Sequence, residues 1–234
     1  MKNLLILFIV FNCFGISAQT TATEYFNQGN TKADLKDYYG AISDYTKAIE
    51  INPDFVYAYN SRGISKQYLK DYYGAISDYA KAIEIDPMYV DLYSNRGFAK
   101  NKLKDYYGAI ADFTKAIKLE PNLWYLYHNR GISKSRSKDY YGAISDYTKA
   151  IEIDFNNALV YNSRGVAKRG LKDYYGAISD YSKAIEINPN YTDAYYNRGF
   201  AKSLLGNKDA CKDYKKASSL GDKEALKELR YYCK

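Results

Sequence analysis

Side chains able to perform chemistry are few in this sequence of 234 residues. His128 is the only histidine, so a catalytic or metal site that needs two histidines is excluded by count. The sequence also lacks a glycine-rich phosphate loop, a nucleophile elbow and a Cys-x-x-Cys pair. Its acidic residues recur at a fixed spacing, which indicates that they have a structural role and not a catalytic one. We therefore expect a non-enzymatic protein without a bound cofactor or metal ion.

The cysteines are the other reactive side chains, and there are three of them. Cys211 and Cys233 lie near the C-terminus, eleven positions either side of residue 222. Two helices joined near Gly221 would run antiparallel and bring these cysteines together at the open end. We therefore predict a Cys211–Cys233 disulfide, which oxidising compartments favour. The alternative is two unpaired thiols packed as small apolar groups.

The first residues are typical of an export signal. Lys2 precedes an unbroken apolar run over residues 4–11, and Ala18 offers a small residue for cleavage. We predict that residues 1–18 are a removed signal peptide and that the protein acts in the periplasm, in the outer cell envelope or as a secreted protein. The run is shorter than the roughly 20 residues of a membrane-spanning helix, so we expect no membrane span. In the alternative, Cys13 is acylated, although the residues before it are atypical of a lipoprotein.

Composition argues against a nucleic-acid partner. The formal net charge is +7, but the 34 basic and 27 acidic residues are interspersed without a long basic block. The 29 tyrosines, against 9 phenylalanines, instead suggest that a short tyrosine-containing segment is repeated along the chain. We therefore expect no nucleic-acid binding.

An internal repeat positions most of the side chains described so far. The phrase Asp-Tyr-Tyr-Gly-Ala-Ile starts at positions 34 residues apart: Asp37, Asp71, Asp105, Asp139 and Asp173. In each unit, bulky residues at helical spacing precede and follow a Lys-Asp pair, which predicts two helices with the aspartate capping the second. Proline closes most units, but Phe155 replaces it in the fourth, so we expect that turn to be looser or to run differently.

This pattern resembles the tetratricopeptide repeat family. The second unit matches the family's positions with Tyr59, Gly63, Tyr72, Ala75, Tyr79, Ala82 and Pro87. The resemblance covers about residues 22–220. It implies an all-α, right-handed superhelical solenoid of antiparallel helix pairs, with about six repeats and a C-terminal capping helix. First helices would line a concave groove, and second helices would face outward. We expect residues 19–234 to form a single solenoid. Its repeats would lie near residues 22–55, 56–89, 90–123, 124–157, 158–191 and 192–220, with a cap over 222–234.

Arginine stands where the family usually has leucine, at Arg62 and its copies. Antiparallel helices joined near Lys70 bring Arg62 and Asp78 to the same level, because each lies eight positions from the turn. We therefore predict a ladder of ion pairs, Arg62–Asp78, Arg96–Asp112, Arg130–Asp146 and Arg164–Asp180. The functional alternative is that these arginines point into the groove and hold an acidic ligand. For the tyrosine pairs, we expect Tyr72 in the core and Tyr73 packed on the neighbouring unit.

The resemblance implies a scaffold that binds a protein or peptide through its groove. Carrying over the family's groove positions predicts the contact residues Tyr57, Asn60, Asn95, Phe98, Lys102, Tyr125, His128, Asn129, Arg136, Asn162, Tyr196 and Asn197. The asparagines suit the backbone of an extended segment, and the basic residues favour an acidic or C-terminal one. Asn95 and Asn129 share the register of an asparagine with which related domains clamp a C-terminal carboxylate. The alternatives are a structural spacer or assembly component, and a solenoid that binds carbohydrate or peptidoglycan.

Overall fold

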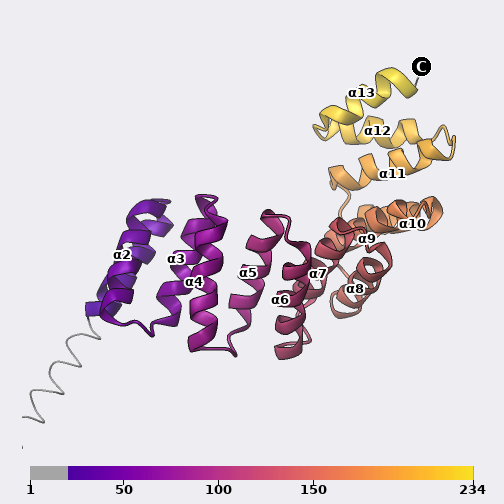
Figure 1. The fold of residues 1–234 in the computed structure, drawn as a ribbon. Helices are drawn as coiled ribbons and strands as arrows, with labels where there is room; N and C mark the ends of the chain where they lie inside the picture. Colours follow the sequence, from indigo (N-terminus) through magenta and orange to yellow (C-terminus); the bar gives the residue numbers. More distant parts are fainter. Residues whose placement is uncertain (1–20, 234) are drawn as a thin grey trace, which may run out of the picture. The chain divides into compact units, whose positions relative to one another are not determined.

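A computed structural model describes residues 21–233, which contain helices and turns but no strand (Figure 1). A helical segment over residues 21–34 comes first. The helices that follow are α2 (Tyr38–Ile51), α3 (Val56–Tyr68), α4 (Tyr72–Ile85), α5 (Val90–Lys102), α6 (Tyr106–Leu119), α7 (Trp124–Arg136), α8 (Tyr140–Ile153), α9 (Ala158–Gly170), α10 (Tyr174–Ile187), α11 (Thr192–Leu204), α12 (Ala210–Ser219) and α13 (Lys223–Tyr232). The predicted signal peptide lies outside the described residues.

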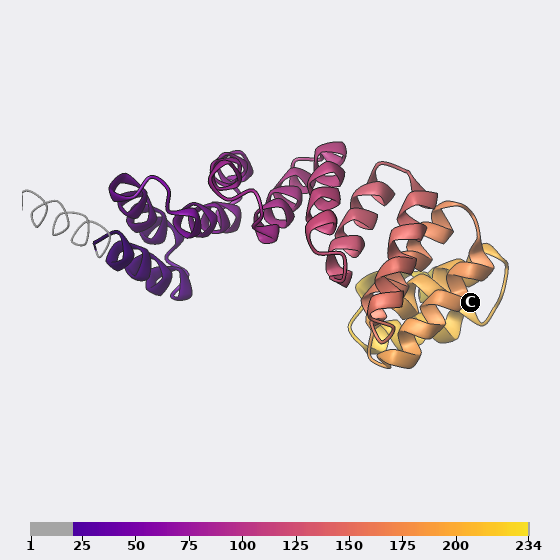
Figure 2. The same ribbon diagram turned by 90° about the horizontal axis from the view of Figure 1, so that it is seen from below.

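The chain divides into two compact units, Met1–Leu119 and Glu120–Lys234. Within the first unit, each helix from α2 to α6 packs against the next, and the same holds from α7 to α13 in the second (Figure 2). Such consecutive packing of short helices joined by tight turns makes each unit a stack of antiparallel helix pairs. The predicted fold class, an all-α solenoid of helix pairs, is confirmed.

The aspartate of the repeated Asp-Tyr-Tyr-Gly-Ala-Ile segment caps the N-terminus of the second helix. Asp71 accepts a hydrogen bond of 2.9 Å from the Gly74 backbone N–H, which satisfies one of the unpaired donors of the first turn of α4. A Cβ on Gly74 would lie 2.2 Å from a carboxylate oxygen of Asp71, so only glycine leaves room for this cap. The residue before the cap, Lys70, has φ +64°, which turns the chain sharply between α3 and α4.

The core of each repeat is built from small residues around one ring. Ala75, Tyr79 and Ala82 of α4 are fully buried. Gly63 of α3 allows close approach, because a Cβ there would lie 2.7 Å from the Tyr79 ring. Tyr73, which follows Tyr72 in the repeated segment, is 76% exposed, so the prediction that it packs on the next repeat is wrong. Tyr73 is the second residue of α4, and its ring faces solvent.

The turn at Phe155 spans four residues, as the first proline turn does, but its backbone is more extended: Asn157 has φ −112°, where the corresponding Phe55 has −78°. Asp154 accepts a hydrogen bond from the Asn156 backbone N–H at 3.3 Å and another from the Asn157 amide at 2.9 Å. Asn52 in the first proline turn holds Asp54 in the same way, at 3.2 Å. An aspartate or asparagine two residues before the bonded N–H fixes this turn, and the proline is dispensable.

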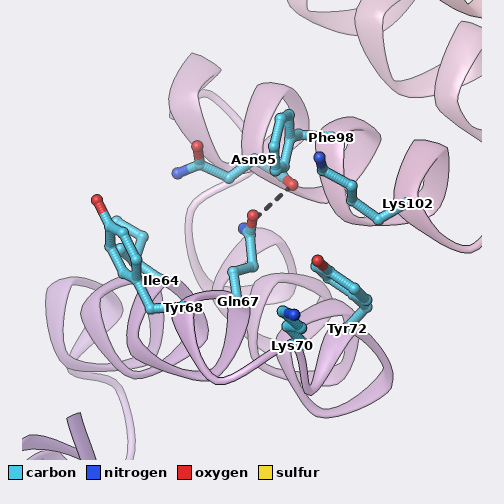
Figure 3. A pocket seen from close by; sticks show the side chains of 8 residues that line it. All are labelled: Ile64, Gln67, Tyr68, Lys70, Tyr72, Asn95, Phe98 and Lys102. Atoms are coloured by element: carbon cyan, nitrogen blue, oxygen red, sulfur yellow. Dashed lines mark hydrogen bonds between the residues drawn. The ribbon is translucent and has the colours of Figure 1, made fainter.

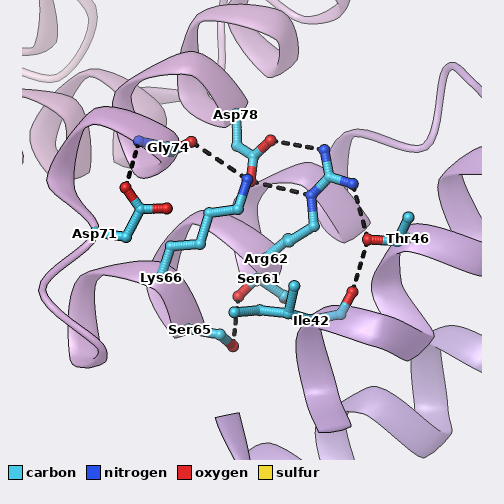
Figure 4. Close-up of polar contacts among 9 residues, drawn as sticks. All are labelled: Ile42, Thr46, Ser61, Arg62, Ser65, Lys66, Asp71, Gly74 and Asp78. Atoms are coloured by element: carbon cyan, nitrogen blue, oxygen red, sulfur yellow. Dashed lines mark hydrogen bonds and ion pairs between the residues drawn. The ribbon is translucent and has the colours of Figure 1, made fainter. Parts of the chain in front are cut away.

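The predicted Arg–Asp ladder is confirmed in its four pairs, of which Figure 4 shows Arg62–Asp78. Arg62 donates to both oxygens of Asp78, at 3.0 and 2.7 Å, and Lys66 reaches the same carboxylate at 2.7 Å. The Arg62 guanidinium also donates to the Thr46 hydroxyl of the preceding repeat, at 3.0 Å. A fifth pair, Arg198–Asp213, follows the same pattern at 2.6 Å. Each cluster therefore ties the two helices of a repeat around a buried carboxylate.

The C-terminus ends in the predicted extra helix, α13, which Asp222 caps through a 2.9 Å hydrogen bond from the Ala225 N–H. Ala225 is fully buried against α12. Cys211 and Cys233 are joined by a disulfide, with their Cα atoms 5.7 Å apart. None of the helices described between residues 21 and 233 combines the length and apolar character that crossing a membrane requires.

Candidate functional site

A pocket of about 540 Å³ opens in the first unit between α3 and α5, beside the start of α4 (Figure 3). Its lining residues are Ile64, Gln67, Tyr68, Lys70, Tyr72, Asn95, Phe98 and Lys102. Three of these, Asn95, Phe98 and Lys102, are predicted contact residues, and the structure brings them together. The other five were not predicted as contact residues. Ile64, Gln67 and Tyr68 belong to the second half of α3 and Lys70 to the turn after it, while Tyr72, expected in the core, is the half-buried first residue of α4.

The floor of this pocket is a polar network. The Gln67 amide donates to the Asn95 backbone carbonyl at 3.4 Å and to the Tyr79 hydroxyl. The Asn95 side chain in turn donates to the Asn60 side chain at 3.1 Å. Burial raises the pKa of Tyr79, so its hydroxyl stays neutral. The network holds Asn95 in one orientation across two neighbouring repeats.

Aromatic rings and cations form the rim. Phe98 is 45% exposed, and the Lys102 ammonium lies 4.9 Å from the centre of its ring. Tyr68 stacks on Tyr38 with ring centres 4.6 Å apart. Lys70 supplies a second cation, and no acidic residue lines the pocket. The site therefore offers flat apolar area beside positive charge.

The second unit holds a related network three repeat lengths later. The Asn197 side chain donates to Asn162 at 3.1 Å, as Asn95 does to Asn60. Arg169 occupies the position of Gln67, donates to Asn197 at 3.2 Å and lies 5.1 Å from the centre of the Phe200 ring.

The replacement of Gln67 by Arg169 leaves the tyrosine beneath it without a hydrogen bond. The hydroxyl of Tyr181, the counterpart of Tyr79, is buried and has no hydrogen-bond partner within residues 21–233. Burial raises the pKa of Tyr181 to about 12. The two networks therefore share a framework and differ in charge.

Three predicted contact residues are buried, namely Asn60, His128 and Asn162, with exposed fractions of 9%, 5% and 8%. His128 hydrogen-bonds with the Ser163 hydroxyl at 3.0 Å, which links α7 to α9. Its ring contacts Tyr147 at 5.6 Å between centres. Burial lowers the pKa of His128 to about 4, so the ring is neutral near pH 7. These three side chains therefore lie beneath the surface and are largely shielded from a ligand.

The other predicted contact residues are not among the residues that line this pocket. Tyr57 is 58% exposed and borders a separate hollow of about 240 Å³ with Phe55. The partly buried Tyr125 and Tyr196 each contact a neighbouring ring. Asn129 and Arg136 lie on α7, the latter exposed at its end. Among residues 21–233 there is no group of three or more His, Cys, Asp or Glu side chains suited to a metal ion.

Comparison with known families gives matches along most of the chain. Models described as "TPR repeat" match residues 68–104 and 169–206, and models described as "Tetratricopeptide repeat" match residues 22–55, 90–123 and 125–157. No curated protein sequence matches the chain.

Solved structures share the fold. The MamA protein is 25% identical with a TM-score of 0.68, over 73% of this chain and 93% of MamA. PilF of Pseudomonas aeruginosa is 18% identical with a TM-score of 0.70, over 93% and 94%. YrrB, described as a TPR protein with an unusual peptide-binding site, is 22% identical with a TM-score of 0.63, over 80% and 97%.

Proposed function

The chain belongs to the tetratricopeptide repeat family, and on that premise we propose that it is a non-enzymatic scaffold that binds a protein or peptide segment. The observation that carries this proposal is the pocket between α3 and α5, where three predicted contact residues gather with exposed aromatic rings. Proteins of this family are typically interaction scaffolds. The remaining predicted contact residues, in both units, stay a prediction.

The chemistry of the pocket indicates which segments it would accept. An apolar or aromatic side chain would enter against Phe98 and Tyr72, and the Asn95 amide offers a donor and an acceptor to a peptide backbone. Lys70 and Lys102 would favour an acidic side chain or a free carboxylate nearby. The binding energy would come mainly from the aromatic contact, because hot spots of interfaces are usually buried rings.

The test is a selection of peptides from a random display library on the protein, followed by affinity measurements with two variants. We expect Phe98→Ala/Lys102→Ala to weaken the selected peptides at least about tenfold, because truncating a central ring typically costs more than about 1 kcal/mol. Both side chains are exposed, so the variant should fold normally. The control is Lys81→Ala/Met88→Ala, two exposed residues outside the pocket. If no peptide is enriched, or if the two variants bind equally well, the proposal fails.

We also propose that the protein is exported. The sequence of residues 1–18 supports this, and a Cys211–Cys233 bond would persist in an oxidising compartment. N-terminal sequencing of the protein from fractionated cells should give a chain starting at Gln19, outside the cytoplasm. A full-length chain in the cytoplasmic fraction would contradict export without bearing on the pocket.

A further inference from the structure

Five tyrosines stand almost fully exposed at one position of the repeat. Each is the second residue of a second helix, and the exposed fractions lie between 76% and 78%. We call this set the tyrosine row: Tyr39, Tyr73, Tyr107, Tyr141 and Tyr175. The structure gives them no hydrogen bond and no ring contact with any residue between 21 and 233. The fold does not need these rings, unlike the adjacent Tyr72 and the buried Tyr79.

The rings lie singly and not in a continuous apolar patch. Packed helices are roughly 8–10 Å apart and each repeat adds two helices, so equivalent tyrosines of one unit are separated by on the order of 20 Å. The first unit carries three of them, on α2, α4 and α6, and the second unit carries two, on α8 and α10. Protein interfaces usually need a contiguous area of about 800 Å² per partner, which isolated rings do not provide.

The surface around each ring is polar and close to neutral. Lys70 and Asp71 precede Tyr73, and Ser77 follows one helical turn later on the same face. Beyond it, Lys81 pairs with Glu84 at 2.8 Å. The same pairing occurs at Lys149–Glu152 and Lys183–Glu186. Of the five helices that carry the row, only α6 departs from this pattern, since Ala111 replaces the serine and Lys118 replaces the glutamate.

We propose that the tyrosine row binds a neutral polysaccharide. A sugar ring has an apolar C–H face, which a flat exposed aromatic can cover, and hydroxyl edges, which serine, lysine and aspartate side chains can hydrogen-bond. A linear polymer presents the same unit again and again, so one chain can meet successive tyrosines of one unit. Because lysine and acidic residues balance beside most rings, the row lacks the excess of positive charge by which single-stranded nucleic acid or an anionic membrane is bound.

This row is distinct from the peptide pocket. The two adjoin at the start of α4, where Lys70 and Tyr72 line the pocket and Tyr73 belongs to the row. Phe98 and Lys102 lie on α5, so they can be replaced without changing the row. The proposal therefore does not depend on peptide binding.

The experiment is native electrophoresis of the protein in gels that contain hydroxyethyl cellulose or glycol chitin, with polymer-free gels as reference. We expect the unmodified protein to be retarded by at least one polymer. Replacement of all five tyrosines by serine should raise the apparent Kd at least about tenfold, since several contacts to one polymer act together. The fivefold Tyr→Phe variant keeps the rings and should bind within about threefold of the unmodified protein. Phe98→Ala/Lys102→Ala should bind the polymer normally.

Several results would overturn the proposal. One is no retardation of the unmodified protein by either neutral polymer, and another is equal retardation of the serine variant. Circular dichroism of the serine variant checks the fold, which these exposed side chains should not affect. Parallel measurements use oligo-dT and sedimentation with phosphatidylserine vesicles. The unmodified protein could bind one of these probes, fail to bind either neutral polymer, and lose the probe in the serine variant. That result would make the row a nucleic-acid or membrane surface and would refute the polysaccharide proposal.

Discussion

Replacing Asp78 by asparagine should destabilise the first unit more than replacing either of its cationic partners. Asp78 is 3% exposed and receives Arg62 through two hydrogen bonds and Lys66 through a third contact at 2.7 Å. Asparagine keeps the volume but removes the anion, which leaves two shielded cations facing each other. Removing one partner of a buried ion pair typically costs about 3–5 kcal/mol.

The two partner variants leave a neutralised carboxylate behind, so their costs should be smaller. Arg62→Met removes the bidentate contact and the hydrogen bond to Thr46, but Lys66 still pairs with Asp78. Hydrogen bonds to charged groups contribute about 1.5–3 kcal/mol, so we expect a loss of about 2 kcal/mol. Lys66→Met leaves the bidentate pair intact, and because the lysine is 19% exposed its contribution is partly screened and should be about 1 kcal/mol.

Urea unfolding followed by circular dichroism gives the free energies, and hydrogen exchange of the α3 and α4 amides shows where each loss occurs. Exchange is needed because stacked repeats need not unfold in one step. Lys81→Met is the control, since its pair with Glu84 is exposed and should leave stability unchanged. If Asp78→Asn costs less than Lys66→Met, the buried charge does not hold the helices together and our reasoning is wrong.

Three further predictions concern single features of the fold. Cys211→Ser/Cys233→Ser should lower the stability of the C-terminal cap by about 3 kcal/mol, seen as faster exchange in α13; with both cysteines present, titration of the unfolded, unreduced chain that starts at Gln19 should find no free thiol. His128 has a folded pKa of about 4, below the unfolded value near 6.5, so the unfolded state binds the proton first. Stability should fall as pH drops from 6.5 to 4, by on the order of 3 kcal/mol, and urea midpoints of His128→Gln should lack this slope. Lys138→Gly should raise stability by about 0.5–1 kcal/mol in urea unfolding, because Lys138 has φ +68° and Gly206 already occupies the equivalent turn; an unchanged midpoint would argue against backbone strain.

The ion-pair ladder could be predicted from the sequence because it depends on counting within one repeat. Arg62 and Asp78 are equally far from a turn, and a hairpin of two helices brings such residues together. The same counting explains Arg198–Asp213, where one missing residue shortens the separation. Lys66 could have been found too, since it lies one helical turn after Arg62 and therefore faces the same carboxylate.

Features that join neighbouring repeats were harder to predict. His128 was expected at the inner surface, but its partner Ser163 lies 35 residues later in the next repeat. The same separation joins Asn60 to Asn95, and both bonds draw side chains inward that a single-repeat pattern leaves exposed. The misplacement of Tyr73 has the opposite cause: repetition suggested a packing role, although position on the helix directs this ring to solvent.

One substitution within the copied framework separates the chemistry of the two units. Gln67 satisfies the Tyr79 hydroxyl and leaves the first pocket's floor neutral, so its positive charge comes from Lys70 and Lys102 at the rim. Arg169 brings a guanidinium to the same level in the second unit, and the Tyr181 hydroxyl beneath it is left without a partner. An acidic group of a bound segment would therefore meet the Arg169 guanidinium in the second unit, but the neutral Gln67 amide at the equivalent position of the first unit. If both units bind segments, they should therefore select different ones.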